Sequence, residues 1–512
     1  MKRMSLACRW LAFLSFLLLV VACSSSNEGT SAPAEEGEGN TEEEAFDPNS
    51  PLDLDWMVIL YHQQPPKDTV IKEIEELTNT NLDLIWVPDA VKEDRVNAAL
   101  ASGNLPKVIT LQDFRTSSVL NAFRSGQFWE IGPYLDEFPN LSEMNETILE
   151  NVSVDGKIYG IYRERPLSRQ GVVIRQDWLE NLGLEMPTNL EELYEVARAF
   201  TYDDPNGSGA DDTVGFTDRN DLIFGAFKTL ASYHGTPNEW GFDDEGKLMP
   251  EFMTDEYVET MNYMKSLYDE GLINTEFPVT SKEQQQELFM TGRAGIYVGN
   301  MVDARNLRDK AKDINPEMEV AITNRIAGPD GEDRVWAQGG HNGIFAIPKS
   351  SVETEAELKR ILAFFDRIAE EDVYNLMAYG IEDVHYETID GEYFERIEEN
   401  LDDWAAEVQP LVSLVAREMN YLKAYGDPLY EEYERLTEDN NEIIVTNPAE
   451  PLFSPTYTER GTELQKIIDD ATYKYILGEL DEDGFEAEVE RWLTNGGESI
   501  IEELNEDYER LN

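Results

Sequence analysis

Hydrophobic and polar residues follow two different periods in the first part of the body of this chain. Apolar runs of strand length occur at 54–61, 82–87 and 107–111. Between these runs, apolar residues recur every three or four positions at 69–78 and 95–102, which is the spacing of an amphipathic helix. Strands that alternate with helices form a parallel sheet through right-handed crossovers. The pattern therefore predicts an α/β fold that begins β-α-β-α-β.

The rest of the chain is predicted to hold further strands and helices and to end in a helical third, from about residue 353 onward. No internal repeat and no second long apolar run interrupts it. The expected strands are 171–174, 295–298, 319–323 and 343–347, and the expected helices are 177–182, 190–200, 255–270, 282–291, 462–477 and 485–493.

The extreme N-terminus has the order of a bacterial secretion signal. Basic residues precede an apolar run at 10–22, which is too short to span a bilayer comfortably, and Val20-Val21-Ala22 leads into Cys23. We expect residues 1–22 to be removed as a lipoprotein signal peptide and Cys23 to carry the lipid, palmitate included. A plain secretory signal without lipid is the alternative. Both place the protein outside the cytoplasm, and the first anchors it to the outer face of the cell membrane.

Residues 23–49 read as an acidic, disordered stalk. The segment contains Ser, Gly, Pro and Glu, lacks Lys and Arg, and has almost no apolar residue to bury. At roughly 5–6 Å times the square root of the residue number, such a stalk holds the body tens of Å from its anchor.

Composition narrows the classes of partner and of chemistry. The chain has 104 Asp and Glu against 41 Lys and Arg, a net charge of −63, so nucleic acid is excluded as a partner by repulsion. Cys8 leaves with the signal and Cys23 is capped by lipid, so the body contains no disulfide and no Cys nucleophile. The roughly 460 residues after the stalk are enough for two or more domains.

The ends of the predicted parallel strands carry polar residues. Ligands bind such sheets at the carboxyl ends of the strands. This rule selects Tyr61 and His62 after the first strand and Gln112 after the third as candidate ligand contacts.

A loop near residue 204 has the spacing of an EF-hand calcium loop. Oxygen-bearing residues occupy positions one, three, five and nine, glycine occupies position six, and position seven offers a main-chain carbonyl. Position twelve is Gly215 instead of the usual Glu. We expect a structural Ca²⁺ here, with a metal-free turn as the alternative. The expected ligands are Asp204, Asn206, Ser208, Ala210 and Asp212.

Four phrases of this chain resemble extracellular solute-binding proteins of family 1, the oligosaccharide-binding lipoproteins of ABC transporters. They are Ala101-Ser102-Gly103-Asn104-Leu105-Pro106-Lys107-Val108-Ile109, Asp155-Gly156-Lys157-Ile158-Tyr159-Gly160, Arg175-Gln176-Asp177-Trp178-Leu179-Glu180-Asn181-Leu182-Gly183-Leu184 and Tyr379-Gly380-Ile381-Glu382-Asp383-Val384-His385-Tyr386-Glu387. The resemblance is closest to the large Gram-positive members, which are also similar to alginate-oligosaccharide-binding proteins.

The resemblance implies a two-lobed periplasmic-binding-protein-like fold with a multi-crossing hinge. Lobe 1 is expected at 50–165 and lobe 2 at 166–335. Residues 336–385 would return to lobe 1 through hinge crossings, and 386–512 would belong mainly to lobe 2. The implied partners are a carbohydrate and the permease subunits of an ABC importer, and the membrane only through the lipid. We expect a monomer.

Sugars are bound by aromatic faces and by planar polar side chains, which points to residues beside turns and expected lobe crossings. Packing in the core is the alternative for each aromatic residue, an interlobe salt bridge for the arginines and a surface turn for the His-Tyr pair. The candidates are Trp336, Gln338, His341, Trp240, Arg163, Arg165, His385 and Tyr386.

A lipid-anchored glycosidase or polysaccharide lyase is the main rival, since a carboxylate pair is easily hidden among so many acids. No metalloprotease, serine-hydrolase or phosphate-loop motif is present in the sequence. A sugar-sensing lipoprotein that feeds a sensor kinase is a third reading. The favoured function is sugar binding without covalent chemistry.

Overall fold

The computed structural model describes residues 46–512. The predicted signal peptide, the lipid attachment at Cys23 and most of the predicted stalk lie outside the described residues. Residues 46–49 belong to the body, because the Phe46 ring lies 6.0 Å from that of Phe138 and the Asn49 carbonyl accepts a 2.9 Å hydrogen bond from Asn79. The predicted stalk boundary at residue 49 is therefore wrong, and any stalk ends before residue 46.

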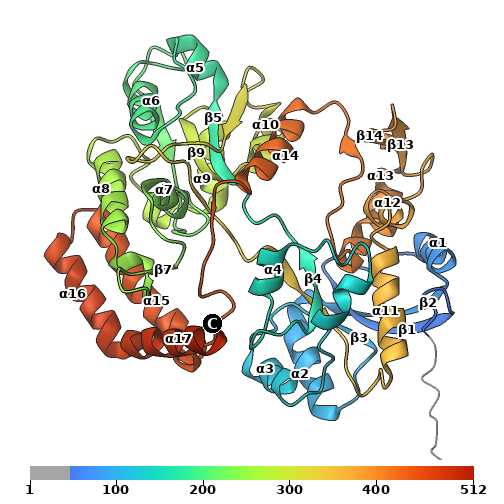
Figure 1. Ribbon diagram of the computed structural model, residues 1–512. Coiled ribbons are helices and arrows are strands. Elements are labelled where there is room, and N and C mark those ends of the chain that lie inside the picture. Colours follow the sequence, from blue (N-terminus) through green and yellow to red (C-terminus); the bar gives the residue numbers. More distant parts are fainter. Residues whose placement is uncertain (1–45) are drawn as a thin grey trace, which may run out of the picture. The chain divides into compact units, whose positions relative to one another are not determined.

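Lobe 1 is built on a five-stranded sheet of order β2-β1-β3-β12-β4 (Figure 1). β1 runs parallel to β2 and β3, whereas β12 is antiparallel to β3 and β4. The elements before the first crossing are β1 (Leu52–Leu60), α1 (Asp68–Thr78), β2 (Thr80–Pro88), α2 (Lys92–Ser102), β3 (Val108–Leu111), α3 (Ser117–Arg124), α4 (Glu146–Asn151) and β4 (Gly160–Glu164).

The predicted β-α-β-α-β start is confirmed. α1 buries Val70, Ile71 and Ile74 from one face, as the three-to-four spacing required. In the sheet, Trp56 of β1 is fully buried, with its indole N–H donating to Thr110 at 3.2 Å and its ring 4.8 Å from Phe345 of β12. The core of lobe 1 therefore joins its first segment to the strand that returns after lobe 2.

Lobe 2 is built on a four-stranded sheet of order β10-β5-β9-β6. A buried cluster that includes Trp178, Phe200 and Phe216 fills its centre. Its elements are β5 (Gln170–Arg175), α5 (Gln176–Leu182), α6 (Leu190–Tyr202), β6 (Val214–Thr217), α7 (Ala226–His234), β7 (Trp240–Phe242), β8 (Leu248–Pro250), α8 (Asp255–Asp269), α9 (Lys282–Met290), β9 (Ala294–Asn300), α10 (Asp303–Ala311) and β10 (Val320–Thr323).

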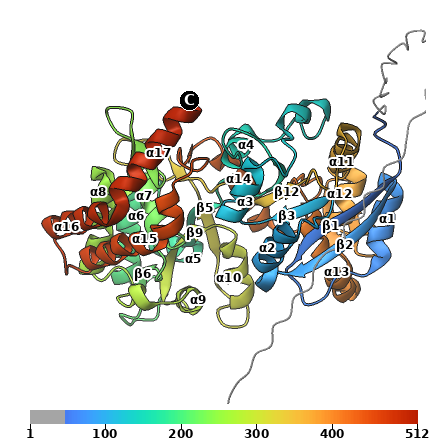
Figure 2. The same ribbon diagram turned by 90° about the horizontal axis from the view of Figure 1, so that it is seen from below.

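The chain then returns to lobe 1 and crosses once more. Elements that complete lobe 1 are β12 (His341–Ala346), α11 (Glu355–Arg367), α12 (Glu371–Ala378), β13 (Tyr386–Ile389), β14 (Tyr393–Arg396), α13 (Leu401–Glu407) and β15 (Lys423–Ala424). The last elements, which pack on lobe 2, are α14 (Pro428–Asn440), α15 (Pro455–Ile476), α16 (Glu482–Trp492) and α17 (Glu498–Leu511). Figure 2 shows these two groups of elements from below.

The boundary predicted at residue 386 is wrong for its first stretch. Tyr386, Val408, Leu411 and Leu422 are buried in the core of lobe 1, and the return to lobe 2 begins only with α14. The sequence could not show this, because the helices on both sides of the boundary have the same amphipathic pattern.

Three crossings join the lobes. The first runs from β4 to β5, and the second holds the short strand β11 (Val335–Trp336), which pairs in parallel with β16 (Ile444–Val445) of the third. The Asn238 amide donates to the carbonyls of Ala337 at 2.6 Å and Val445 at 2.9 Å. Lobe 2 is thereby fastened to two crossings at once.

A triad of charges also bridges the lobes near the C-terminus. The Asp155 carboxylate of lobe 1 accepts from Arg124 of the same lobe at 2.9 Å and from Arg510 of α17 at 2.8 Å. We call Arg124, Asp155 and Arg510 the interlobe triad. The two guanidinium groups hold the pKa of Asp155 below its usual value, so the carboxylate stays charged at neutral pH.

Candidate functional site

A cavity of about 580 Å³ lies between the loop that follows β3 and the first turns of α15. We call it the main cavity. Arg115 reaches it from lobe 1, Glu239 from the α7–β7 loop and Trp240 from the start of β7. Asn447 and Glu450 reach it from the third crossing. Its volume is within the usual range for small-molecule sites, and aromatic residues share its walls with charged groups. The other lining residues are Ala449, Leu452, Phe453, Ser454, Tyr457, Thr458, Gly461, Thr462, Gln465, Asp469 and Leu504.

Arg115 ties the two sides of the main cavity together. Its guanidinium donates to the carbonyls of Asn151 at 2.7 Å and Ser153 at 3.2 Å in lobe 1, and to that of Pro451 at 3.4 Å in the third crossing. No carboxylate of residues 46–512 lies within 4.0 Å of it. Burial lowers the pKa of Arg115 from its ordinary value, opposed mainly by the charge of Glu450. The arginine is thus a cation bound only by neutral carbonyls.

Acidic groups stand on the other wall of the main cavity. Burial raises the pKa of Glu239, Glu450 and Asp469 above the ordinary values. The Asn447 amide donates to the Glu239 carboxylate at 3.1 Å. Carboxylates of this kind accept hydrogen bonds from hydroxyl groups, so the cavity offers acceptors on one side and a guanidinium on the other.

A second group of polar side chains lies at the strand ends of lobe 1. The Tyr61 hydroxyl lies 3.4 Å from the Gln112 side-chain oxygen, and the Gln112 amide donates to the Asn342 oxygen at 3.0 Å. The Arg163 guanidinium donates to Tyr61 at 3.2 Å and to the Asn342 carbonyl at 3.3 Å. We call these four side chains the strand-end cluster. The strand-end rule thus located Tyr61 and Gln112, and Arg163 was located beside the expected crossing, whereas Asn342 was missed.

His341 connects the strand-end cluster to the main cavity. A Cβ at Gly339 would lie 2.9 Å from the Glu450 carboxylate and 3.1 Å from His341 Nε2, so the two side chains border the same point. The main-chain N–H of Gly343 donates to His341 Nδ1 at 3.2 Å, and the Phe114 ring lies 5.4 Å away. Burial, assisted by the charge of Arg115, lowers the pKa of His341 to about 4.

This depressed pKa predicts a loss of stability in mild acid. The unfolded chain, with a His pKa of about 6.5, takes up the proton at a higher pH than the folded protein does. The contribution of neutral His341 to the free energy of unfolding is therefore complete above pH 6.5 and is lost as the pH falls toward 4. At pH 5 the expected loss is at most about 2 kcal/mol. Urea unfolding at pH 7 and pH 5 should show a smaller acid-induced loss for His341→Gln than for the wild type. Equal losses would contradict the assignment.

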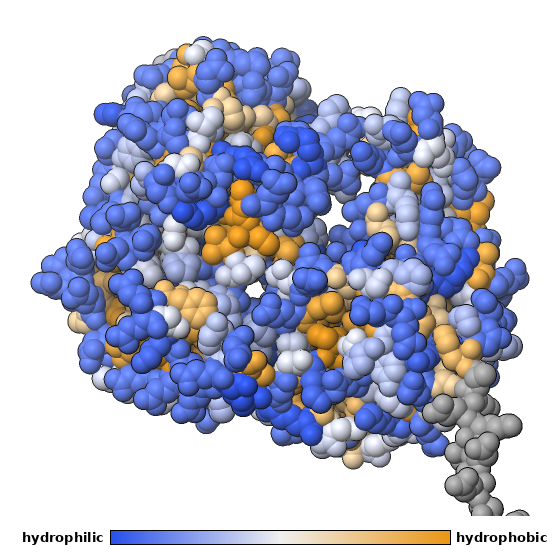
Figure 3. All heavy atoms as spheres, in the orientation of Figure 1, coloured by the Kyte–Doolittle hydropathy of each residue, from blue (hydrophilic) through white to orange (hydrophobic). Residues whose placement is uncertain are grey.

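Lobe 2 contributes an exposed apolar surface at its own strand ends. Ile223 and Phe224, in the loop between β6 and α7, expose 46% and 48% of their surface, and the Phe224 ring lies 5.9 Å from that of Trp336. Asn342 follows Trp336 by six positions, a path of at most about 20 Å, so the Phe224 ring beside Trp336 and the strand-end cluster flank the same crossing. Figure 3 shows a mostly hydrophilic face with several hydrophobic patches toward its middle, where the lobes meet.

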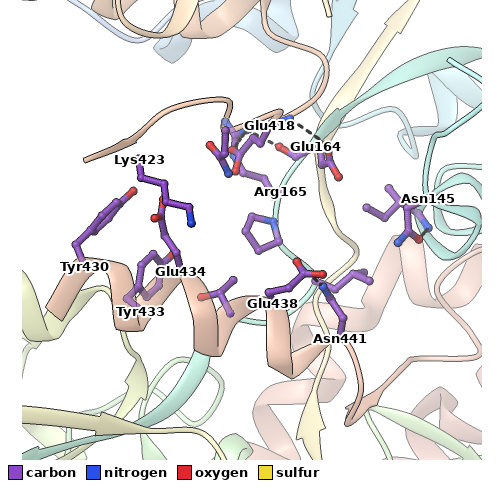
Figure 4. Close-up of a pocket in the computed structure, with 15 residues that line it drawn as sticks. Asn145, Glu164, Arg165, Glu418, Lys423, Tyr430, Tyr433, Glu434, Glu438 and Asn441 are labelled. Carbon is purple, nitrogen blue, oxygen red and sulfur yellow. Dashed lines mark hydrogen bonds and ion pairs between the residues drawn. The ribbon is translucent and has the colours of Figure 1, made fainter. Parts of the chain in front are cut away.

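A smaller cavity of about 310 Å³ lies on another side of the hinge (Figure 4). Arg165, which pairs with Glu418 at 3.0 Å, and Glu164 border it from lobe 1 and the first crossing. Tyr430 and Tyr433 border it from α14, with their rings 5.6 Å apart. The predicted residue Arg165 thus lies at an interlobe cavity, and its salt-bridge partner Glu418 belongs to the lobe 1 segment before β15, so the pair is not the interlobe salt bridge that was the alternative.

The two cavities are separated by the Gly339–Gly340 segment. A Cβ at Gly340 would lie 2.6 Å from Ile148, which lines the smaller cavity, just as one at Gly339 would meet Glu450 of the main cavity. At these two glycines only the main chain of the second crossing stands between the neighbouring side chains. Both cavities therefore border the same hinge segment.

Comparison with known proteins decides the family. The model of the bacterial extracellular solute-binding proteins matches residues 63–373. The chain is 60% identical over 503 residues to the polygalacturonan/rhamnogalacturonan-binding protein YtcQ of Bacillus subtilis (strain 168), covering 98% of this chain and 99% of that one. The chain belongs to the bacterial extracellular solute-binding proteins.

Other comparisons agree with this membership. Lipoprotein LipO of Bacillus subtilis (strain 168) is 34% identical over 510 residues, which cover 98% of each chain. The crystal structure of the alginate-binding protein AlgQ2 without calcium ion superimposes with a TM-score of 0.61 at 19% identity, covering 91% of this chain and all of that one. The predicted family and the two-lobed fold are confirmed, and this solute-binding protein acts outside the cytoplasm.

Several residues predicted to contact ligand lie elsewhere in the solute-binding fold. Trp336 is 4% exposed, and its indole N–H donates to Thr229 at 3.0 Å inside lobe 2. His385 and Tyr386 are 1% and 4% exposed in lobe 1, where His385 Nδ1 accepts from the Ile381 N–H at 2.9 Å. These three predictions are wrong for this structure, because glycine neighbours and motif position do not reveal burial.

The remaining candidates divide between the cavity and the frame of the hinge. Trp240 is largely buried but forms part of the main-cavity wall, and its contact with a ligand stays a prediction. Gln338 donates its main-chain N–H to the Leu167 carbonyl at 2.7 Å, which joins two crossings. His62 lies beside Tyr61 and has no side-chain hydrogen bond to residues 46–512. Arg115, Asn447 and Glu450 were missed.

The predicted calcium loop gathers its oxygen atoms on one side. The Ser208 hydroxyl lies 3.1 Å from an Asp212 carboxylate oxygen and 3.5 Å from the Ala210 carbonyl oxygen, and Asp204 accepts from the Gly209 N–H at 3.0 Å. Among residues 46–512 no group of three or more His, Cys, Asp or Glu side chains is arranged to hold a metal. Besides the carboxylates of Asp204 and Asp212, the predicted ligands of this loop are a hydroxyl, an amide and a main-chain carbonyl.

Position twelve of the loop is closed to any side chain. A Cβ at Gly215 would lie 2.1 Å from the Ala197 carbonyl oxygen in α6. The packing against α6 therefore requires glycine where the EF-hand pattern has Glu.

No helix of residues 46–512 is long and apolar enough to cross a membrane.

Proposed function

We propose that this protein captures acidic oligosaccharides released from polygalacturonan or rhamnogalacturonan. The observation that carries the proposal is 60% identity, over nearly the whole of both chains, to a protein named for binding these polymers. The broader function is that of a carbohydrate-binding component of an ABC importer, in keeping with its family and its relatives. Its relatives are binding proteins, and we infer that this chain likewise performs no covalent step.

The charges at the candidate site support an acidic ligand. Arg115 and Arg163 have no carboxylate of residues 46–512 within 4.0 Å, although the protein has a net charge of −63. A cation left unpaired among so many acids gains most from a carboxylate supplied by the ligand. The carboxylates of Glu239 and Glu450 and the Tyr457 ring of the main cavity would take up hydroxyl groups and an apolar sugar face.

Capture would proceed by closure of the lobes. Contacts from Arg115 on one lobe and from the third crossing on the other select the arrangement in which both touch the sugar. The permease would then recognise the closed form. We also propose that Cys23 carries a lipid, that the protein resides at the outer face of the membrane, and that it is a monomer.

Calorimetry with defined sugars tests this function. We expect trigalacturonic acid to bind with a Kd in the micromolar range or below, and a neutral glucose oligosaccharide of equal length to bind at least tenfold more weakly. Arg115→Gln should weaken binding of the acid at least tenfold, because the guanidinium spans both sides of the main cavity. Arg198→Gln on the surface of α6 is the matched control and should bind like the wild type.

The products in the same samples separate the rival functions. Mass spectrometry should recover the sugar unchanged. Shortened or unsaturated products would make the protein a glycosidase or a lyase. Tight binding by a protein whose permease subunits fail to take up the sugar in vesicles would favour the sensor reading.

We further propose that the loop at residues 204–212 holds a structural Ca²⁺ through Asp204, Asn206, Ser208, Ala210 and Asp212. The ion would fix the loop between α6 and β6. Chelator should lower the melting temperature by about 3 °C or more, because an ion that binds only the folded state stabilises it by mass action. Added calcium should restore the temperature, and Asp212→Ala should remove both responses. A wild-type protein that ignores chelator and calcium alike would refute the site.

A further inference from the structure

We propose that Arg163, behind the side chain of Tyr61, forms a subsite for the carboxylate of one uronic acid unit. This inference rests on the proposed function and adds the group that distinguishes an acidic sugar from its neutral ester. The other members of the strand-end cluster, Gln112 and Asn342, would serve the hydroxyl groups beside that carboxylate.

Arg163 is fully buried and has two guanidinium nitrogens without a hydrogen-bond partner among the residues that the structure describes. Its side chain has no exposed surface, and its guanidinium donates from one nitrogen, to Tyr61 at 3.2 Å and the Asn342 carbonyl at 3.3 Å. Nε and Nη2 have no hydrogen-bond partner in residues 46–512. Buried donors are almost always satisfied in folded proteins, so two free donors on one side chain point to a missing partner.

The charge of Arg163 is also without a counterion. No carboxylate of the described chain lies within 4.0 Å of it, whereas neighbouring Arg165 meets Glu418 at 3.0 Å and Arg308 meets Asp427 at 2.8 Å. A buried unpaired charge is costly to keep. In a chain with 104 acidic residues, a partner carboxylate would be easy to supply from the protein itself. Its absence beside Arg163 fits a partner that arrives with the ligand.

Tyr61 has the properties of a movable cover over Arg163. It exposes 38% of its surface, and the guanidinium carbon lies 5.8 Å from its ring centre. Its hydroxyl has contacts of 3.2 Å to Arg163 and 3.4 Å to both Gln112 and Asn342, which are long for O–H and N–H hydrogen bonds. Rotation of this one side chain would release a donor of Arg163 and the side chains of Gln112 and Asn342.

The freed guanidinium matches a carboxylate in shape and charge. Arginine binds carboxylates through two parallel N–H donors, and Nη1, which Tyr61 would release, and Nη2, which has no partner in residues 46–512, form such a pair. The Gln112 and Asn342 side chains stand beside it and offer amide donors and acceptors to neighbouring hydroxyls. A methyl ester has no negative charge to pair with the guanidinium, so the subsite would discriminate by charge.

The test compares trigalacturonic acid with its fully methyl-esterified form by calorimetry. The wild type should bind the acid at least tenfold more tightly than the ester. Arg163→Gln should weaken binding of the acid at least 30-fold and that of the ester less than threefold. Arg308→Gln, whose guanidinium already has a carboxylate partner, is the control and should keep the wild-type preference. Equal losses for acid and ester in Arg163→Gln would reduce Arg163 to a residue that only positions Tyr61 and Asn342.

A second variant keeps the test decisive if Arg163→Gln does not fold. In Tyr61→Phe the hydroxyl that the carboxylate must displace is gone, so the preference for acid over ester should persist at tenfold or more. Loss of that preference would make the Tyr61 hydroxyl, not Arg163, the discriminating group and would overturn the inference.

The outcomes also separate this inference from the proposed function. A wild-type protein that binds acid and ester equally well refutes the carboxylate subsite and leaves the pectic ligand in place. A wild-type protein that binds neither refutes both.

Discussion

Trp336→Ala is expected to lower the free energy of unfolding by about 3–5 kcal/mol, the usual loss for removing a large buried aromatic side chain. The indole is 4% exposed, and its N–H donates to Thr229 in α7 at 3.0 Å. The substitution would empty the space between the second crossing and α7 and leave the Thr229 hydroxyl without its partner. Urea unfolding followed by circular dichroism measures the change.

Trp86→Ala supplies the matched control for this loss. Trp86 lies on β2, the edge strand of lobe 1, and is only partly buried, so its removal should cost less than half as much. Binding by Trp336→Ala should fall chiefly because Phe224, 5.9 Å away, loses its support. A variant of normal stability that no longer binds sugar would instead return Trp336 to the ligand contacts that the sequence predicted.

Gly343→Ala is the second substitution for which we expect a large effect, a loss of about 2–4 kcal/mol. Gly343 has φ +86°, and an added Cβ would lie 2.3 Å from the Leu111 carbonyl oxygen and 2.5 Å from the Gln112 Cα. Backbone strain and overpacking each cost about 1–3 kcal/mol. Because the obstacle is the backbone of β3, β12 must shift away from it and carry Asn342 out of reach of Gln112. Sugar binding should therefore weaken together with stability.

Gly391→Ala separates the two causes of that loss. Gly391 has φ +75° in the turn between β13 and β14, and nothing lies within 4 Å of an added Cβ. It should cost only about 1 kcal/mol and leave sugar binding unchanged. If both variants lose equal stability and bind sugar alike, the close approach of Gly343 to β3 is unimportant.

The sequence predicted the frame of lobe 1 well because periodicity reports local structure. Alternation of strand and helix gave the first three strands, and the rule for strand ends then gave Tyr61 and Gln112. Arg163 was selected beside an expected lobe crossing, and its guanidinium contacts Tyr61. Tyr61, Gln112 and Arg163 could be selected because each lies at the end of a strand or at a chain crossing that local sequence patterns predict.

The failures have a different physical origin. Trp336 was chosen beside glycines at an expected lobe crossing, and His385 and Tyr386 were chosen from a family phrase, yet each side chain packs into a core that only the tertiary fold creates. Arg115, Asn447 and Glu450 meet at the main cavity from positions more than 300 residues apart in the chain. No local pattern marks such a meeting. The free donors of Arg163 are equally invisible in the sequence, because they are defined by what is absent around them.

Because the interlobe triad joins Arg510 to the other lobe, a dye attached near this residue would report movement of the lobes. Arg510 contacts Asp155 of the other lobe at 2.8 Å, and Asn512 follows two positions later. The sequence has 2 cysteines, Cys8 and Cys23, so a version that starts after Cys23 and carries Asn512→Cys has one thiol for a dye. The dye would stand at the junction of the lobes and away from the strand-end cluster. Its fluorescence would then follow each opening and closing event in real time, which makes the protein a candidate sensor for sugars in solution.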